Sequence, residues 1–346
     1  MQFFDLLSQN EQFLLFSALK VLGVFLVVLP MVGASVLAER RVSAWIQDRI
    51  GPNRVGPLGL LQPLADGVKT MLKEDFTPNH VRKAYFWLAP AITVIPAFLT
   101  LAVIPFGSQL GSQKMVIADL NVGILYTFGI VSLGVYGIVL AGYSSNSKYP
   151  FLGSIRASAQ MISYEIAMGM SVVPLFMLVE SLNLSEVIAY QAGGAWLVFK
   201  QPLAFVIFLI AAFAETNRLP FDLPESETEL VGGYHTEYSS MKFLLFFLGE
   251  YANMIASSAM MVTLFFGGWT LPVMGLDAPA TSILGGLAHV GIFIGKIGLL
   301  MGLFIWVRWM LPRFRYDQLM DLGWTRFIPL ALANILVTAV VLWVIH

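Results

Sequence analysis

The chain has 346 residues, of which 58% are hydrophobic and 12% are charged, and its formal net charge is −1. Soluble domains carry about 25% charged residues, so this composition indicates a polytopic membrane protein without an obvious polyanionic partner. The chain contains no cysteine, which excludes disulfides and cysteine-ligated iron–sulfur clusters within it, and its four histidines are too widely spaced for a metal-ligand motif.

A helix that crosses the bilayer needs about 20 mostly apolar residues. Helices are expected because a segment in lipid must satisfy its own backbone hydrogen bonds. About eight are predicted, at residues 14–38, 85–105, 121–143, 157–180, 202–217, 243–267, 288–307 and 327–345. The fifth is short and ends in charged residues. The prediction is therefore an all-α membrane protein in which residues 1–346 form a single domain.

Basic residues are concentrated on one side of these spans. Sixteen of the 20 Lys and Arg residues fall in the loops 39–84, 144–156, 218–242 and 308–326. Because loops rich in Lys and Arg stay inside, these loops are predicted to be cytoplasmic and both termini periplasmic. No basic segment precedes the first span, so no cleavable signal peptide is expected. The sequence favours a bacterial plasma (inner) membrane over an organelle.

The first inner loop, 39–84, contains a run punctuated by Gly and Pro, Arg49–Pro57, and then an amphipathic segment, 58–73. Leu60, Leu61, Leu64, Val68, Met71 and Leu72 stand near helical spacing there. This pattern predicts a helix lying along the membrane surface. Such a helix can simply anchor the loop, or it can border a site at the height where a lipid-soluble substrate enters.

Two glutamates fall inside predicted spans. Glu165 stands eight residues into the fourth span, about 12 Å deep, near the middle of a hydrocarbon core about 30 Å thick. A carboxylate there costs a few kcal/mol, so it is expected to face the bundle interior and to exchange protons. The alternative is a structural role, with a hydrogen bond to Ser163 or Tyr164. The same argument applies to Glu250, at shallower depth.

Other charges lie within or beside the spans. Lys296, inside the seventh span, is a basic counterpart that can pair with one of the buried carboxylates, in a structural ion pair or a relay. Glu39, followed by Arg40 and Arg41, closes the first predicted span, where simple anchoring at the interface is the alternative to function.

The segment from residue 215 to the end of the third inner loop at 242 is acidic, with Glu215, Asp222, Glu225, Glu227, Glu229 and Glu237. Pro220 and Pro224 lack the backbone N–H that a helix needs and are predicted to end one. Glu215 and Arg218 stand three residues apart, so they can pair on one helical face. Interspersed apolar residues such as Phe221 favour partial burial, but a solvated acidic loop explains the composition equally well.

Three runs carry a resemblance to a known family: Arg49–Lys69, Glu215–Ser239 and Pro312–Leu319. Together they closely resemble the H subunit of the bacterial proton-pumping NADH:quinone oxidoreductase, respiratory complex I, whose mitochondrial counterpart is NADH dehydrogenase subunit 1. The resemblance covers essentially the whole chain. It implies a membrane subunit at the junction with the peripheral arm, which forms much of the ubiquinone chamber and starts a chain of carboxylates toward the proton channels.

The resemblance also implies roles for individual residues. Around the quinone chamber and its entrance it places Arg40, Arg49, Arg54, Asp66, Arg218 and Phe221. On the proton path it places Glu165, Glu215, Asp222, Glu225, Glu227 and Glu250. In the last inner loop, Arg313, Arg315 and Asp317 match a motif expected to hold partner subunits.

The implied cofactors lie elsewhere in the complex. Ubiquinone is the expected substrate, the flavin and iron–sulfur clusters belong to partner subunits, and this chain is expected to hold no metal and to have no activity alone. The expected partners are other subunits of the membrane arm, the quinone-proximal subunits of the peripheral arm and lipids, with no nucleic acid. A related subunit of a membrane-bound hydrogenase or formate hydrogenlyase, an ion transporter and a pure docking scaffold remain alternatives.

Overall fold

The computed structural model describes residues 9–110, 113–223, 231–272 and 275–345. Within these ranges seven helical segments are long and apolar enough to cross a membrane. They are α1 (Gln9–Ile46), α3 (Lys83–Leu101), α4 (Gly123–Ser144), α5 (Lys148–Val179), α10 (Ser240–Phe265), α11 (Ile283–Met310) and the stretch Tyr316–Ile345. That stretch comprises α12 (Tyr316–Asp321), a π-helical turn η4 (Leu322–Phe327) and α13 (Ile328–Ile345).

The remaining elements are short. They are η2 (Pro57–Gly59), α2 (Gln62–Leu72), α6 (Leu184–Ala192), α7 (Leu197–Lys200), α8 (Pro202–Glu215), η3 (Gly233–His235) and the antiparallel strands β1 (Gln109–Leu110) and β2 (Gln113–Lys114). The all-α polytopic class is confirmed. Seven of the predicted spans correspond to the long helices, whereas the fifth, α8, is shorter than a full span.

Several helices extend beyond the predicted spans. Helix α1 continues to Ile46, so Glu39, Arg40 and Arg41 lie inside the helix and do not close it. Helix α5 begins at Lys148, which makes most of the predicted loop 144–156 helical. Glu165 nevertheless stays near the middle of this helix of 32 residues.

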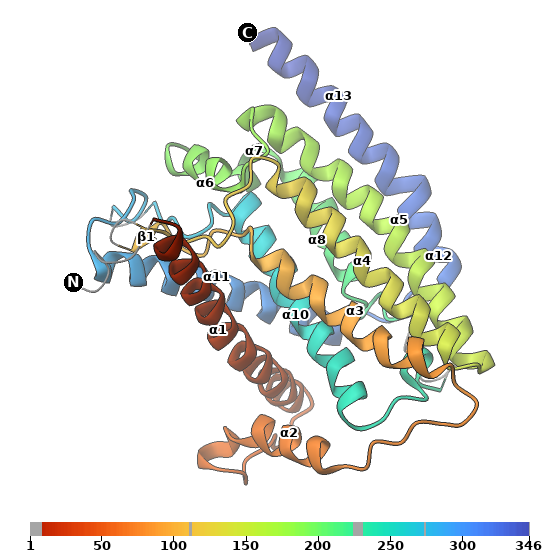
Figure 1. The fold of residues 1–346 in the computed structure, drawn as a ribbon. Coiled ribbons are helices and arrows are strands. Elements are labelled where there is room, and N and C mark those ends of the chain that lie inside the picture. The colour runs from red at the N-terminus through yellow and green to blue at the C-terminus, as the bar shows by residue number, and fades with distance from the viewer. Residues whose placement is uncertain (1–8, 111–112, 224–230, 273–274, 346) are drawn as a thin grey trace.

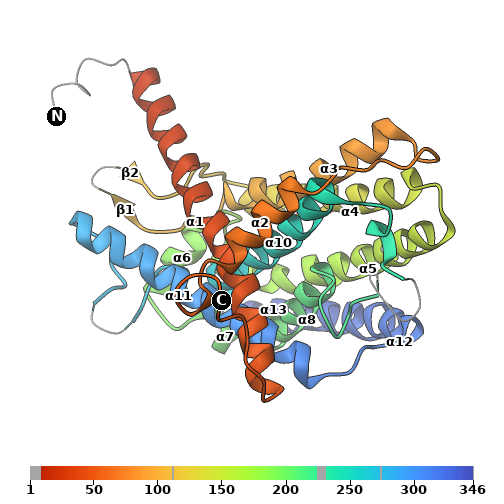
Figure 2. The same ribbon diagram turned by 90° about the horizontal axis from the view of Figure 1, so that it is seen from below.

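The helices form one bundle around α5. Figure 2 shows α3, α4, α5 and α13 following one another across it, and each packs on its neighbour in that order. Helix α8 packs on α5, α10 packs on α3, and the tilted α1 contacts α10 and α11 (Figure 1). Buried side chains of α5, α8, α10 and α11 form most of the larger hydrophobic core.

The predicted inner loops contact one another at one end of the bundle. Arg82 N–H donates to the Ser144 carbonyl at 2.9 Å, and Phe314 N–H donates to the Pro220 carbonyl at 3.1 Å. Ser240 Oγ also donates to the Thr70 carbonyl at 3.0 Å, which joins the third loop to the first. At the opposite end, Ser108 Oγ lies 2.8 Å from His289 Nδ1. The four loops therefore share one side, as the distribution of basic residues predicted.

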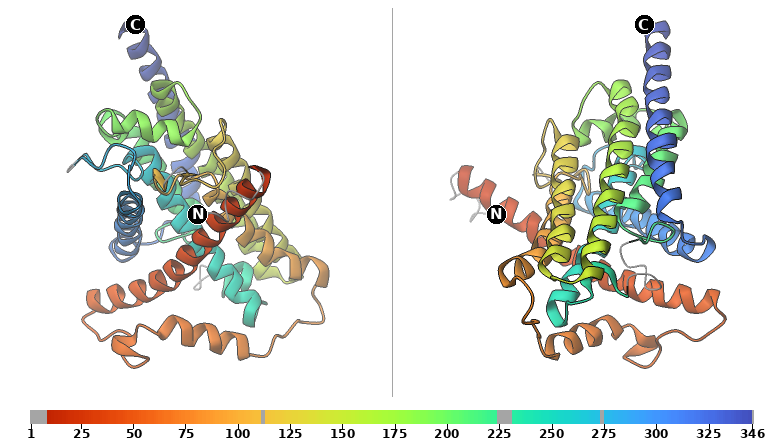
Figure 3. Two further views of the ribbon diagram at one scale, coloured as in Figure 1. Left: turned by 60° about the vertical axis from the view of Figure 1, so that its left-hand side comes forward. Right: turned by 90° about the vertical axis from the view of Figure 1, so that its right-hand side faces the viewer.

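Helix α2 crosses the end of the bundle that holds the predicted inner loops, near the ends of α1 and α10 (Figure 3). It has no buried residue, and Leu64 and Leu72 are 67% and 83% exposed. The turn before it requires glycine, because Gly59 has a φ of +75° and a Cβ there would meet the Pro52 carbonyl. The predicted surface helix is therefore present, and its apolar face is uncovered within the described residues.

Candidate functional site

The end of α8 directs two charged side chains to different places. Asn217 has a φ of +52°, and the N–H groups of Asn217 and Arg218 donate to the carbonyls of Ala214 and Phe213 at 3.3 and 3.2 Å. These two bonds form a Schellman motif with Asn at the left-handed position. The helix therefore ends at Glu215, before Pro220, and the prediction that Pro220 ends it was wrong. Glu215 and Arg218 consequently do not share a helical face, contrary to the sequence-based prediction.

Glu39 is the centre of a charge cluster, which comprises Glu39, Arg218, Glu250, Tyr251 and the partly exposed Arg308. Arg218 Nη1 donates to both Glu39 carboxylate oxygens at 3.1 Å. Tyr251 O–H donates to Glu39 Oε2 at 2.7 Å, and Arg308 also pairs with Glu39. Interfacial anchoring alone therefore does not describe Glu39, which joins α1 to α10, α11 and the loop after α8.

Arg218 connects Glu39 to the second carboxylate of the cluster. Its Nε lies 2.7 Å from Glu250 Oε1, and its guanidinium stacks over the Tyr251 ring, 4.4 Å from the centroid. The side chains of Glu39 and Arg218 are each 9% exposed. Two carboxylates thus face two guanidinium groups, and buried ions are tolerated when they are paired and hydrogen-bonded in this way.

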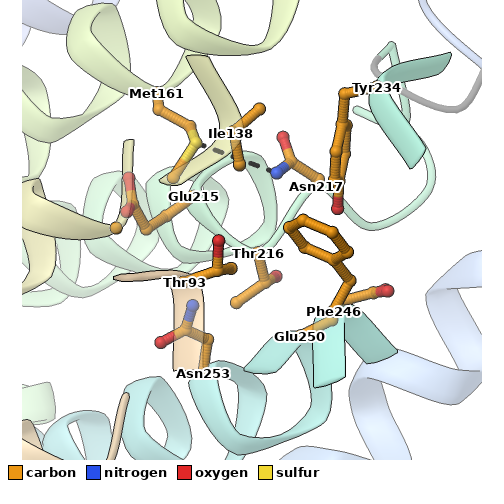
Figure 4. A pocket seen from close by; sticks show the side chains of 11 residues that line it. Thr93, Ile138, Met161, Glu215, Thr216, Asn217, Tyr234, Phe246, Glu250 and Asn253 are labelled. Carbon is orange, nitrogen blue, oxygen red and sulfur yellow. Dashed lines mark hydrogen bonds between the residues drawn. The ribbon is translucent and has the colours of Figure 1, made fainter. Parts of the chain in front are cut away.

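Glu215 is buried without such compensation. It is 4% exposed, and neither carboxylate oxygen has a hydrogen-bond partner among the described residues. It borders a cavity that Glu250 also lines. The space in this cavity that the centre of a water molecule can occupy is ≈ 20 Å³. A polar cavity of this size can hold a water molecule. Figure 4 shows the two glutamates on different sides of the cavity, with Thr93 and Thr216 drawn between them.

Glu165 extends this group of carboxylates into α5. Its carboxylate lies near Ser132 of α4, whose hydroxyl donates to the Phe128 carbonyl at 2.8 Å, and Tyr164 donates instead to the Leu319 carbonyl. Glu165 also lies close enough to Glu215 for their charges to repel each other. Glu215 therefore lies near both Glu165 and Glu250, and these three residues are predicted to lie on one proton path.

Asp222 connects the acidic loop to the last inner loop of the same chain. Arg313 Nη2 donates to Asp222 Oδ2 at 2.8 Å. Phe221 is 3% exposed, and its ring lies 5.4 Å from that of Phe314 and 5.5 Å from that of Tyr164. Arg313 thus has a partner within this chain, and Phe221 packs in the core. Arg315 pairs with Asp317 at 3.3 Å, and both are largely exposed.

The predicted entrance residues lie nearer the surface. Arg40 pairs with Asp66 of α2, which also accepts a hydrogen bond from Gln62 at 3.0 Å. Arg49 is exposed and bonds Gln47 at 2.7 Å. Arg54 is exposed and has no hydrogen-bond or ion-pair partner among the described residues. Arg49 and Arg54 thus remain outside the charge cluster. Glu225, Glu227 and Glu229 lie outside the described residues.

Lys296 does not pair with a buried carboxylate in the part of the chain that the structure describes. Its ammonium donates to the carbonyls of Phe266, Gly268 and Thr270 at 2.7, 2.9 and 2.6 Å. These carbonyls follow the C-terminus of α10, where the helix dipole favours a positive charge. The predicted ion pair is therefore replaced by a structural cap.

Outside the spans, His235 and Tyr238 lie just before the start of α10. The His235 ring lies against Tyr234 and Phe243, at 5.1 and 5.3 Å between centroids, and burial lowers its pKa to about 4. Burial also raises the pKa of Tyr238, whose ring stacks on Phe86 at 4.0 Å. Both side chains are therefore neutral near pH 7.

Two members of the charge cluster, Tyr251 and Arg308, were not predicted from the sequence. Glu39 was predicted at the end of a span, with function and interfacial anchoring as alternatives. A signal existed for Glu39 and Arg308, since each is a charge within an apolar helix. Their pairing joins segments 269 residues apart and could not be derived from local spacing.

Comparison with known proteins agrees with this fold. The family model described as NADH dehydrogenase matches residues 19–339. An NADH-quinone oxidoreductase H subunit of Cytophaga hutchinsonii is 52% identical over 334 residues, which cover 94% of this chain and 96% of that protein. The corresponding H subunit of Flavobacterium psychrophilum is 49% identical over 342 residues, covering 96% and 98%. A match over nearly the full length shows that this chain belongs to the NADH dehydrogenase family.

Proposed function

We propose that the chain is the membrane subunit of an NADH:quinone oxidoreductase that forms the quinone chamber and couples quinone reduction to proton translocation. The observation that carries the proposal is the position of Glu215, a buried carboxylate without a hydrogen-bond partner in the described ranges, beside a cavity shared with Glu250. The names of the relatives give the enzyme class. The chain acts as part of that complex and has no activity alone.

In this proposal the inner end of the molecule receives the quinone. Arg40, Asp66, Arg49 and Arg54 lie at or near α2, whose uncovered apolar face suits the membrane surface. A quinone that enters at this height meets basic groups from the first inner loop. The flavin and iron–sulfur clusters that deliver electrons belong to partner subunits, because this chain has no cysteine to ligate a cluster.

The charge cluster supplies a physical link between the two processes. Quinone reduction takes up two protons and two electrons, which changes the electrostatic potential around the chamber. Arg218 bridges Glu39 and Glu250, and Glu250 shares a cavity with Glu215. A change in charge on the chamber side therefore alters the proton affinity of the next carboxylate. Each tenfold change in that affinity corresponds to about 1.36 kcal/mol of coupling free energy. Glu165 continues this path within α5.

The substitution Arg49→Ala tests the chamber assignment. Arg49 is exposed, so its removal has little effect on folding. In membranes from cells that carry this variant, we expect NADH:quinone activity to fall while NADH oxidation with an artificial acceptor is retained. Lys69→Ala, which removes an exposed charge from α2, is the matched control.

Unchanged quinone kinetics in an assembled Arg49→Ala complex would contradict the chamber assignment and favour a docking scaffold. The purified complex also tests the enzyme class. An NADH-oxidising flavoprotein among its subunits supports the proposal, whereas a nickel–iron subunit supports the hydrogenase alternative.

A further inference from the structure

Helix α2 is held in place by polar contacts at both ends. None of its residues is buried, so hydrophobic packing alone does not fix its position. On the N-terminal side, Arg40 of α1 pairs with Asp66 in the second turn of α2, and Arg41 donates to the carbonyl of Leu58 in the turn η2 before the helix. At the other end, the contacts come from Ser240 and Lys242 in the first turn of α10.

Ser240 binds the C-terminal turn of α2. It is 3% exposed, and its Oγ lies 3.0 Å from the carbonyl oxygens of both Thr70 and Lys73. One hydroxyl proton is therefore shared between two carbonyls that the helix end leaves without an internal partner. Ser240 also has a φ of +53°, which is uncommon for a residue other than glycine.

Lys242 binds the segment that follows α2. Its side chain is 7% exposed, and its ammonium donates to Asp75 Oδ1 at 3.0 Å and to Thr77 Oγ1 at 2.8 Å. The same ammonium lies 3.9 Å from the centroid of the Trp87 ring in α3. Two hydrogen bonds and an aromatic face therefore compensate a buried lysine, which is rare without a partner.

We propose that Ser240 and Lys242 are positioning residues that fix α2 to α10, the helix that carries Glu250 and Tyr251. The inference rests on the proposed quinone site, because α2 would border the quinone's path from the membrane. Loosening α2 changes that border but leaves the charge cluster intact. A long-tailed quinone, whose tail stays in contact with the border, depends on this position more than a short-tailed one.

The test uses Lys242→Gln in the assembled enzyme, with Lys69→Gln, an exposed lysine on α2, as the control. The KM for a quinone with a long isoprenoid tail is expected to rise about fivefold, the ratio that corresponds to about 1 kcal/mol. The KM for a quinone with a single isoprenoid unit and the kcat for both are expected to change little. Lys242→Arg, which keeps the charge, should restore much of the long-tail KM. Equal effects on both quinones, or no effect on either, would overturn the inference.

A second measurement does not depend on quinone. Ser240→Ala removes the shared hydroxyl and should accelerate amide hydrogen exchange over residues 62–77 in the complex, whereas Lys69→Gln should not. Unchanged hydrogen exchange would overturn the proposed role of Ser240 in fixing α2 to α10. If Arg49→Ala impairs quinone reduction and Lys242→Gln does not, only the positioning role fails. If Arg49→Ala also has no effect, the proposed quinone site fails.

Discussion

Individual carboxylates in this protein differ in how their charge is compensated. Glu39 accepts hydrogen bonds from two arginines and a tyrosine, whereas Glu215 has no hydrogen-bond partner in the described part of the chain. The sequence presented both as acidic residues near the end of an apolar segment. Only contacts between distant helices distinguish them, so their different roles could not be predicted from the sequence.

This difference predicts unequal effects on stability. Glu39→Gln removes the carboxylate that Arg218 and Arg308 share. Because Glu250 still pairs with Arg218 and Arg308 is partly exposed, the subunit should be destabilised by about 2 kcal/mol, less than for an unpaired buried ion. Glu215→Gln removes an uncompensated carboxylate and should change stability by less than about 1 kcal/mol in either direction. Thermal unfolding of the two purified variant complexes checks this, and equal losses of stability would argue against the assigned pairing.

His235 predicts a pH dependence near the start of α10. Its folded pKa of about 4 lies below the unfolded value of 6.5, so the unfolded state binds more protons between these values. The stability of this loop should therefore fall as the pH drops from 6.5 to about 4, by at most about 3 kcal/mol. Hydrogen exchange over residues 231–245 measures it, and His235→Phe, which keeps an aromatic ring, should reduce the dependence. The same pH dependence in both proteins would exclude His235 as its source.

At the scale of helices, hydropathy predicted where the long spans lie but not where they end. Helices α1 and α5 continue through residues assigned to loops, because the hydrogen bonding of a helix does not stop where its apolar residues do. The end of α8 shows the reverse. Pro220 and Pro224 were predicted to end this helix, yet Asn217, with its left-handed backbone, ends it earlier.

Two substitutions separate the backbone role of Asn217 from its side-chain contacts. Both Asn217→Ala and Asn217→Gly lose the bond from Gln160 at 3.2 Å. Only alanine has a Cβ that disfavours the left-handed conformation, so it should be less stable than the glycine variant by about 1 kcal/mol. Thermal unfolding of the two complexes gives this difference directly. Similar stabilities would show that the Schellman turn does not depend on this residue.

At the scale of the molecule, the distribution of Lys and Arg correctly grouped the four inner loops at one end of the bundle. Hydropathy singled out Glu165 and Glu250 as charges inside spans, and the family resemblance placed Glu215 with them; the structure places Glu215 near each of the two. Arg308 and Tyr251 were missed because their partners are far away in sequence. The roles proposed for Arg49 and Arg54 stay predictions, since neither side chain reaches the charge cluster.

The proposed orientation predicts which end is accessible from each side of the membrane. Tyr149, at the inner end of α5, and Phe199, on α7, are 52% and 75% exposed. Because the chain has no native cysteine, Tyr149→Cys and Phe199→Cys each introduce a single thiol into it. An impermeant thiol reagent should modify position 199 in spheroplasts and position 149 in inverted vesicles. The opposite pattern would reverse the orientation.

The most direct test of the central claim is proton pumping by membranes that carry Glu165→Gln, measured together with NADH:quinone activity. We predict that both rates fall at least about tenfold, which corresponds to an activation barrier higher by about 1.4 kcal/mol, while the complex assembles and oxidises NADH with an artificial acceptor. Full quinone reduction with full proton pumping in this variant would contradict a coupling path through the buried carboxylates.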